Sequence, residues 1–251
     1  MIKFKIFLII IISCVFNLNL YASSNIKLIK VSSVKLDDFS AIKRGARIFF
    51  DYCQGCHSLK YMRYSDLATG IHISGNKSYN ELIREYFLHS TDSINENSPI
   101  LSSISKEYGV KWFGKVPPDL SLIIKYRGVD WLYTYMQSFY KDRSRPFGVN
   151  NLVFPDVAMP HALVKLQGIQ VLKENHHKYS DIENMLQLVE NGILSRDNYN
   201  LVVKDLVTFL SYISEPNAVI RNAIGIFVVG YFIILAVLLY FIKRSYWKDI
   251  K

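Results

Sequence analysis

Residues 42–57 read IKRGARIFFDYCQGCH, and this stretch decides the fold. Its apolar positions recur at the spacing of one helix face: Ile42, Ala46, Phe49, Phe50 and Cys53. The spacing predicts a helix over residues 42–53 that leads straight into the motif CQGCH. Two of the chain's three cysteines, Cys53 and Cys56, lie in this motif, and His57 follows directly.

Several kinds of site contain two cysteines at this spacing. A structural zinc site needs four ligands, and no second cysteine pair follows in the sequence. A thioredoxin-like dithiol comes after a strand, whereas the residues before Cys53 have a helical pattern. A disulfide across a two-residue loop would restrict the unfolded chain very little, and it would leave His57 unexplained.

Covalent haem attachment accounts for all three residues of the motif. Cysteines at positions i and i+3 face the same side of a helical turn. Their sulfurs can form thioethers with the two vinyl groups on one edge of a porphyrin, and the histidine that follows can bind the iron. The motif therefore predicts haem c, with Cys53 and Cys56 as tethers and His57 as the proximal ligand.

The residues alone define the second axial ligand less closely. Met62 is too near the motif to reach the opposite face of the ring, and Met136 and Met185 lie in patterns typical of a protein core. Met159 lies in the proline-flanked loop FPDVAMPH, from which a side chain can be aimed at a flat cofactor. His161, two residues later, is the alternative. A methionine ligand would give a higher reduction potential than a second histidine.

Apolar runs occupy both ends of the chain. Residues 1–22 start with lysines, continue with an apolar core and end at the small residue Ala22, which predicts a secretory signal that is cleaved. A short N-terminal anchor and a lipid-modified Cys14 are the alternatives. Residues 222–242 form an apolar segment long enough to cross a bilayer as one helix. The tail, residues 243–251, is basic and aromatic.

These runs predict one topology in the cell inner membrane. The exported body, residues 23–221, would lie on the periplasmic side as a haem domain. A single-pass helix would anchor it, with the basic tail in the cytoplasm. The formal charge of the whole chain is +9, but the signal and the tail contribute much of it. No dense stripe of lysine and arginine occurs, so nucleic acid is not an expected partner.

The body is predicted to be mainly helical. An aromatic-rich helix is expected over residues 121–140 and an amphipathic helix over 201–213, with a loop over 144–161. Short helices and long loops are expected over 58–115. Residues 173–200 show no clear pattern, and no run of alternating polar and apolar residues predicts a strand.

Further motifs follow the haem motif in a distinctive order, and together they resemble the cytochrome c1 family of bacterial cytochrome bc1 complexes. The matching segments cover nearly the whole mature chain: Lys43 to Gly45, Cys53 to His57, Ser58 with Tyr61 to Tyr64, Trp112 to Ser121, Arg127 to Asp142, Arg145 to His161, and Tyr246 to Asp249. Residues 173–200 follow the family only loosely.

The resemblance implies a class I cytochrome c-like haem domain with loop insertions, followed by one C-terminal transmembrane helix. It implies Met159 as the distal haem ligand and Arg127 as the partner of a haem propionate. The segment Pro117–Pro118–Asp119 would pack along the haem edge.

The implied function is electron transfer in a respiratory cytochrome bc1 complex during quinol oxidation. The chain would accept an electron from a Rieske iron–sulfur protein and pass it to a cytochrome c acceptor. It would lie beside cytochrome b and membrane lipid, in a complex that the family implies to be dimeric. No catalytic residue is expected, so the chain would be a non-catalytic subunit of quinol–cytochrome c oxidoreductase. The alternatives are a membrane-anchored cytochrome c that feeds a terminal oxidase, and an exported metal-binding or scaffold protein with an incidental CxxCH.

Overall fold

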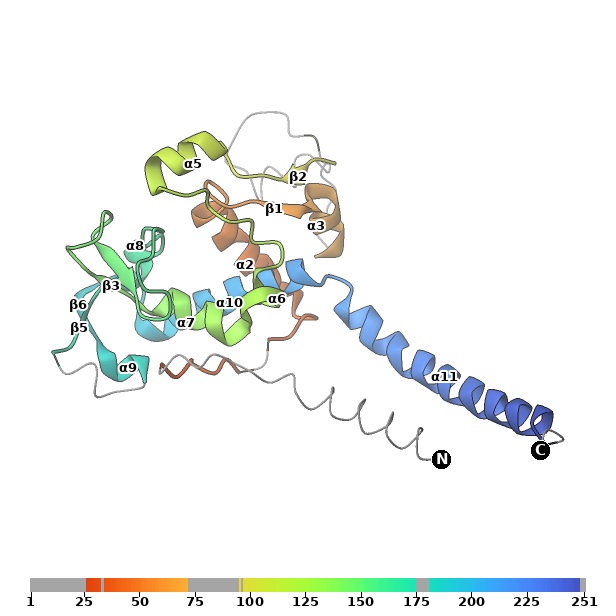
Figure 1. The fold of residues 1–251 in the computed structure, drawn as a ribbon. Helices are drawn as coiled ribbons and strands as arrows, with labels where there is room; N and C mark the ends of the chain where they lie inside the picture. Colours follow the sequence, from red (N-terminus) through yellow and green to blue (C-terminus); the bar gives the residue numbers. More distant parts are fainter. Residues whose placement is uncertain (1–25, 33, 72–94, 96, 175–180, 249–251) are drawn as a thin grey trace.

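The computed structural model describes residues 26–32, 34–71, 95, 97–174 and 181–248. The predicted signal over residues 1–22, with Ala22 and Cys14, lies outside these ranges. Figure 1 shows a head of short helices and small hairpins from which one long helix extends.

The described elements are given in chain order. They are helix α2 (Phe39–Tyr52), strand β1 (Leu59–Arg63), helix α3 (Tyr64–Gly70), strand β2 (Pro99–Ile100), helices α5 (Lys106–Phe113), α6 (Ile123–Arg127) and α7 (Val129–Gln137), strands β3 (Phe139–Lys141) and β4 (Val149–Asn151), helix α8 (Val164–Gln167), strand β5 (Gly168–Leu172), helix α9 (Ile182–Met185), strand β6 (Leu186–Asn191), and helices α10 (Arg196–Ser214) and α11 (Ala218–Tyr246). Helices dominate, which agrees with the predicted fold class. The strands form three separate antiparallel pairs, β1–β2, β3–β4 and β5–β6.

Helices α2 and α10 cross at the centre of the head (Figure 1). Each begins at a capping residue, Asp38 for α2 and Ser195 for α10, whose side-chain oxygen accepts a backbone N–H of the first turn. The helices approach closely because Gly45 has no side chain. A β-carbon at this position would lie 2.0 Å from the Asp205 carbonyl oxygen. The glycine is therefore a requirement of the crossing.

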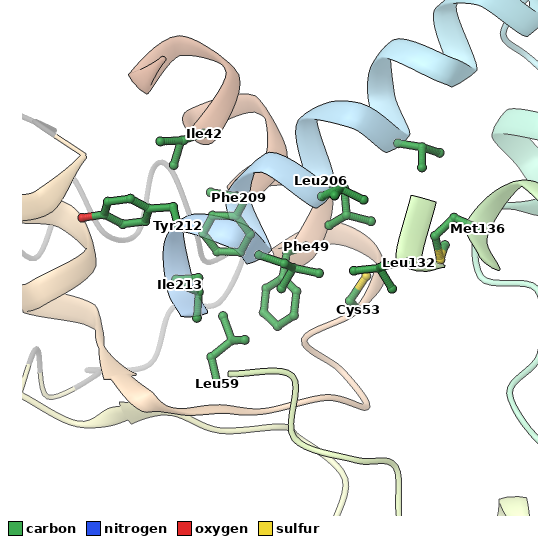
Figure 2. Packing of buried hydrophobic residues seen from close by; sticks show 14 of the residues in the cluster. Ile42, Phe49, Cys53, Leu59, Leu132, Met136, Leu206, Phe209, Tyr212 and Ile213 are labelled. Atoms are coloured by element: carbon green, nitrogen blue, oxygen red, sulfur yellow. The ribbon is translucent and has the colours of Figure 1, made fainter. Parts of the chain in front are cut away.

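The core surrounds this crossing (Figure 2). Phe49 of α2 lies against Phe209 of α10, with the ring centroids 5.6 Å apart, and both side chains are fully buried together with Leu59 of β1. Burial of each such side chain contributes on the order of 1.5–3 kcal/mol. Cys53 belongs to the same cluster, so the core holds the start of the haem motif in place.

The aromatic segment over residues 121–140 is not the single helix that its pattern predicts. It divides into α6 and α7 at Gly128, whose φ of 90° interrupts the helix, and it continues into β3. Side chains avoid this region of φ, whereas glycine adopts it readily. Aromatic residues continue across the break, so their spacing does not reveal it.

Strands were also missed by the sequence pattern. The loop predicted over residues 144–161 contains β4. The segment 173–200 contains α9, β6 and the start of α10 among its described residues. In β6 only Leu186 is buried, and the next five residues are exposed. A strand of this kind shows no alternation of polar and apolar residues, which is why the pattern gave no signal.

Helix α11 is the described helix that is long and apolar enough to cross a membrane. It extends away from the head (Figure 1). Its side chains beyond Ala218 are largely exposed in the described chain. A helix that is apolar on all sides needs lipid or partner helices around it. The segment predicted to span, residues 222–242, lies inside this helix.

Candidate functional site

The CQGCH motif forms the tight turn that ends α2. The Cys53 amide donates to the Phe49 carbonyl at 2.8 Å, and the amides of Cys56 and His57 both donate to the Cys53 carbonyl, at 3.0 and 2.8 Å. The two cysteines and the histidine are therefore held together in one turn. Cys53 is 8 % exposed, Cys56 is partly exposed, and both are free thiols.

The environment of the two thiols does not suit a redox dithiol. Burial raises the pKa of Cys53 to about 12, and the neighbouring Cys56 adds to this effect. Burial also raises the pKa of Cys56. A reactive dithiol needs the opposite shift, since the thiolate is the nucleophile.

One hydrogen bond orients the buried ring of His57. Its Nδ1 lies 2.8 Å from the Pro118 carbonyl oxygen. A carbonyl only accepts hydrogen bonds, so Nδ1 carries the proton and Nε2 keeps its lone pair. Burial lowers the pKa of His57, although the bond to Pro118 and the charge of Asp119 oppose the shift. A backbone partner on one nitrogen, with the other free, is typical of a metal-binding histidine.

The segment 117–121 holds this orienting carbonyl beside the motif. The Leu120 amide donates to the Ser58 carbonyl at 2.9 Å. The Asp119 carboxylate accepts the Lys60 amide, also at 2.9 Å. These bonds tie the segment to the residues just after the haem motif. Packing of this segment along a haem edge, which the family resemblance implies, stays a prediction.

Met159 lies in the loop between β4 and α8. Its sulfur accepts a hydrogen bond from the Tyr135 hydroxyl of α7, with a distance of 3.3 Å. The side chain packs against the main hydrophobic cluster but is only partly buried. A thioether sulfur has two lone pairs, so one remains available for a metal.

The alternative ligand, His161, is engaged elsewhere. Its Nε2 lies 2.7 Å from the Gln167 side-chain oxygen, and its ring stacks on Phe139 with centroids 4.7 Å apart. The amide oxygen takes the Nε2 proton, so only the buried Nδ1 could bind a metal. Burial lowers the pKa of His161 to about 4. These contacts favour Met159 over His161.

The other methionines in the described chain are core residues. Met62, Met136 and Met185 are 5 %, 4 % and 5 % exposed, and each packs in a hydrophobic cluster. For Met136 and Met185 this is the environment that the sequence predicted.

Arg127 ends α6 with its guanidinium over aromatic rings. The guanidinium carbon lies 4.7 Å from the Trp131 ring centroid, 4.8 Å from that of Tyr126 and 5.6 Å from that of Phe154. Arg127 is exposed, and it forms no ion pair with any carboxylate of the described ranges. A cation held in this way can bind an anionic group. Its pairing with a propionate stays a prediction.

Sequence reasoning missed Trp131 and Tyr135 as residues of the site. The two rings stack with centroids 5.1 Å apart and an angle of 12° between their planes. The Trp131 ring contacts the Arg127 guanidinium, and the Tyr135 hydroxyl donates a hydrogen bond to the Met159 sulfur. Part of the signal was present, because Trp131 and Tyr135 are four residues apart in α7 and such residues meet on one helix face. Arg127 precedes the break at Gly128, so its position over the Trp131 ring depends on the fold.

These residues offer donors that fit a covalently attached haem. Two thiols and an imidazole with a free Nε2 share one turn, and a thioether lies in the same head. Across the described ranges, no group of three or more His, Cys, Asp and Glu side chains is arranged to hold a metal ion. The zinc alternative therefore finds no further ligands there.

Comparison with known proteins gives consistent matches. The model of the family described as the Cytochrome C1 family matches residues 32–250. Cytochrome c1 of Allochromatium vinosum is 39% identical over 237 residues, which cover 92% of this chain and 93% of that protein. A Nitrosomonas europaea protein named ammonia monooxygenase gamma subunit is 36% identical over 224 residues, covering 88% of this chain and 89% of its own length. A chain of a hyperthermophilic respiratory Complex III aligns over 99% of both chains, with 15% identity and a TM-score of 0.43, which is too low to support the fold.

Proposed function

Because the chain belongs to the cytochrome c1 family of c-type cytochromes with covalently bound haem, we propose that it is the electron-transfer subunit of a respiratory cytochrome bc1 complex. The observation that carries the proposal is the turn of CQGCH. In it Cys53, Cys56 and His57 share one turn, and the bond from Nδ1 to Pro118 leaves the lone pair on Nε2 of His57. The alternative of an incidental CxxCH is excluded by the family match.

Each residue of the proposed site has a separate task. Cys53 and Cys56 tether the haem, His57 and Met159 bind its iron, and Arg127 pairs with a propionate. The bound haem supplies reversible one-electron chemistry at its iron. The chain itself would hold the group in one place and set its reduction potential through the ligands.

The electron enters and leaves through partners in this proposal. A Rieske iron–sulfur protein donates it, and a cytochrome c acceptor takes it. Oxidation of quinol occurs on the partner subunits, so the chain by itself is non-catalytic. Feeding a terminal oxidase directly is the second candidate, and the family match disfavours it.

Helix α11 supports a place beside cytochrome b and lipid. A single span cannot build a quinone site, and its apolar surface needs packing partners. The basic tail from residue 243 onward would lie in the cytoplasm, which puts the head on the periplasmic side. The complex is proposed to be dimeric, as the family implies.

Purification from membranes tests the assignment to a complex. The full-length chain, tagged at its C-terminus and isolated in mild detergent, is expected to bring with it a multi-span b-type cytochrome and an iron–sulfur protein. The preparation should reduce a cytochrome c at the expense of quinol. Recovery of the haem-loaded chain alone, or together with a terminal oxidase, would contradict the proposal.

Acid–acetone extraction tests the two tethers. Haem is expected to stay with the wild-type polypeptide and to be extracted completely from the Cys53→Ala/Cys56→Ala variant, because thioethers survive this treatment and iron ligation does not. Extraction of haem from the wild type would show that attachment is not covalent.

A further inference from the structure

The hydroxyl of Tyr135 has one partner in the described chain, the sulfur of Met159 at 3.3 Å. Tyr135 is 8 % exposed, so water does not readily replace that partner. Hydrophobic packing needs only the ring of Tyr135, so the hydroxyl that bonds the sulfur of a candidate ligand calls for a separate explanation.

The ring of Tyr135 cannot easily turn away from the sulfur. One face stacks on Trp131, at 5.1 Å between centroids, and Phe139 meets the ring edge-on at 5.1 Å. Aromatic pairs with these geometries are typically attractive. These ring contacts therefore keep the Tyr135 hydroxyl directed at the Met159 sulfur.

The backbone of Tyr135 is tied to the chain that carries Met159. Asn151, 1 % exposed, donates from its side-chain amide to the Tyr135 carbonyl at 2.8 Å. Its side-chain oxygen accepts the amides of Val153 and Phe154, at 3.1 and 3.2 Å. Because these residues begin the loop that leads to Met159, the hydroxyl and the sulfur are held by one network.

This contact has a chemical consequence for a bound metal. The hydrogen bond occupies one lone pair of the thioether and leaves the second for the iron. It also withdraws electron density from the sulfur. Oxidised iron depends more on that density than reduced iron does, so the hydrogen bond favours the reduced state.

We propose that Tyr135 is a positioning residue for Met159, which orients the sulfur and raises the reduction potential of the haem. The inference rests on the proposed role of Met159 as an iron ligand. Trp131 and Asn151 act through Tyr135, by fixing its ring and its backbone.

The test is Tyr135→Phe in the full-length, haem-loaded protein, studied by redox titration and absorption spectroscopy. Phenylalanine keeps the stack on Trp131 and removes only the hydroxyl, so folding is retained. The midpoint potential is expected to fall. At a fixed solution potential near the midpoint, the ratio of reduced to oxidised haem should decrease roughly two- to tenfold, the range of one net hydrogen bond.

Tyr199→Phe is the matched control. Tyr199 is 2 % exposed, and its hydroxyl donates to the Met136 carbonyl at 2.7 Å. The same atom is thus removed from a second buried tyrosine, whose hydroxyl bonds the Met136 carbonyl instead of the Met159 sulfur. Thermal stability should fall in this variant, whereas the midpoint potential should stay at the wild-type value.

Three outcomes would overturn the inference, and they can be told apart. An unchanged potential in Tyr135→Phe, with the far-red methionine–iron band present in the wild type, removes the role of Tyr135 and leaves the ligand assignment standing. An equal shift in Tyr199→Phe shows a general loosening of the core. Absence of the far-red band from the wild type removes Met159 as ligand, and the role of Tyr135 with it.

Discussion

Replacing Met159 with histidine is expected to lower the midpoint potential by a substantial part of the roughly 0.8 V that axial ligands cover across haem proteins. An imidazole donates more strongly to oxidised iron than a thioether does, so it stabilises the oxidised state. The weak far-red methionine–iron band, which the family resemblance implies, should vanish, while the haem stays covalently attached. Redox titration and the absorption spectrum measure both effects.

A second methionine provides the control for this substitution. Met185 is 5 % exposed and packs in the smaller hydrophobic cluster with Leu152, Ile182 and Leu186. Met185→Leu should leave potential and spectrum unchanged. If the Met159→His protein kept the wild-type band and potential, Met159 would not be the ligand. In that case His161 would be the second axial ligand of the iron, and His161→Gln should remove that ligand.

Gly45→Ala is expected to cost about 3 kcal/mol or more of stability, at the upper end of overpacking effects. Elsewhere in a helix the same change would stabilise the protein by about 1 kcal/mol, because alanine is the better helix former. Here the new β-carbon would lie 2.0 Å from the Asp205 carbonyl oxygen and 2.8 Å from the Phe209 β-carbon. Backbone cannot move aside as a flexible side chain can, so the clash outweighs the helix propensity.

Thermal unfolding of the full-length, haem-loaded protein in detergent measures this cost. The apparent melting temperature should fall by roughly 6–12 °C in Gly45→Ala. Gly230→Ala is the control, because Gly230 also lies within a helix and a β-carbon there meets no described atom within 4 Å. Equal melting temperatures for Gly45→Ala and the wild type would mean that α2 and α10 can separate without cost.

Much of the helical framework could be predicted from sequence, because it depends on local periodicity. The helix predicted over residues 42–53 corresponds to α2, and the one over 201–213 lies inside α10. The break at Gly128 and the strand β6 were missed for different reasons. The break depends on one backbone angle, and β6 has only one buried residue to mark it.

The proposed haem ligands likewise divide into residues that local spacing identifies and a residue that depends on distant contacts. Cys53, Cys56 and His57 could be chosen from their spacing, since five residues in one turn need no distant contact to come together. The choice between Met159 and His161 stayed open at the level of residues. It depends on partners such as Gln167 and Tyr135, which the fold brings to the two side chains.

The sequence by itself determined that this chain carries a haem attachment motif and a membrane span, because both signals lie within one turn or one helix. The tertiary structure decided which nitrogen of His57 is free, because the Pro118 carbonyl comes from 61 residues away. It also decided that Tyr135 meets the Met159 sulfur and that Gly45 must lack a side chain. These contacts join segments far apart in the chain, and only the packing of the whole head brings them together.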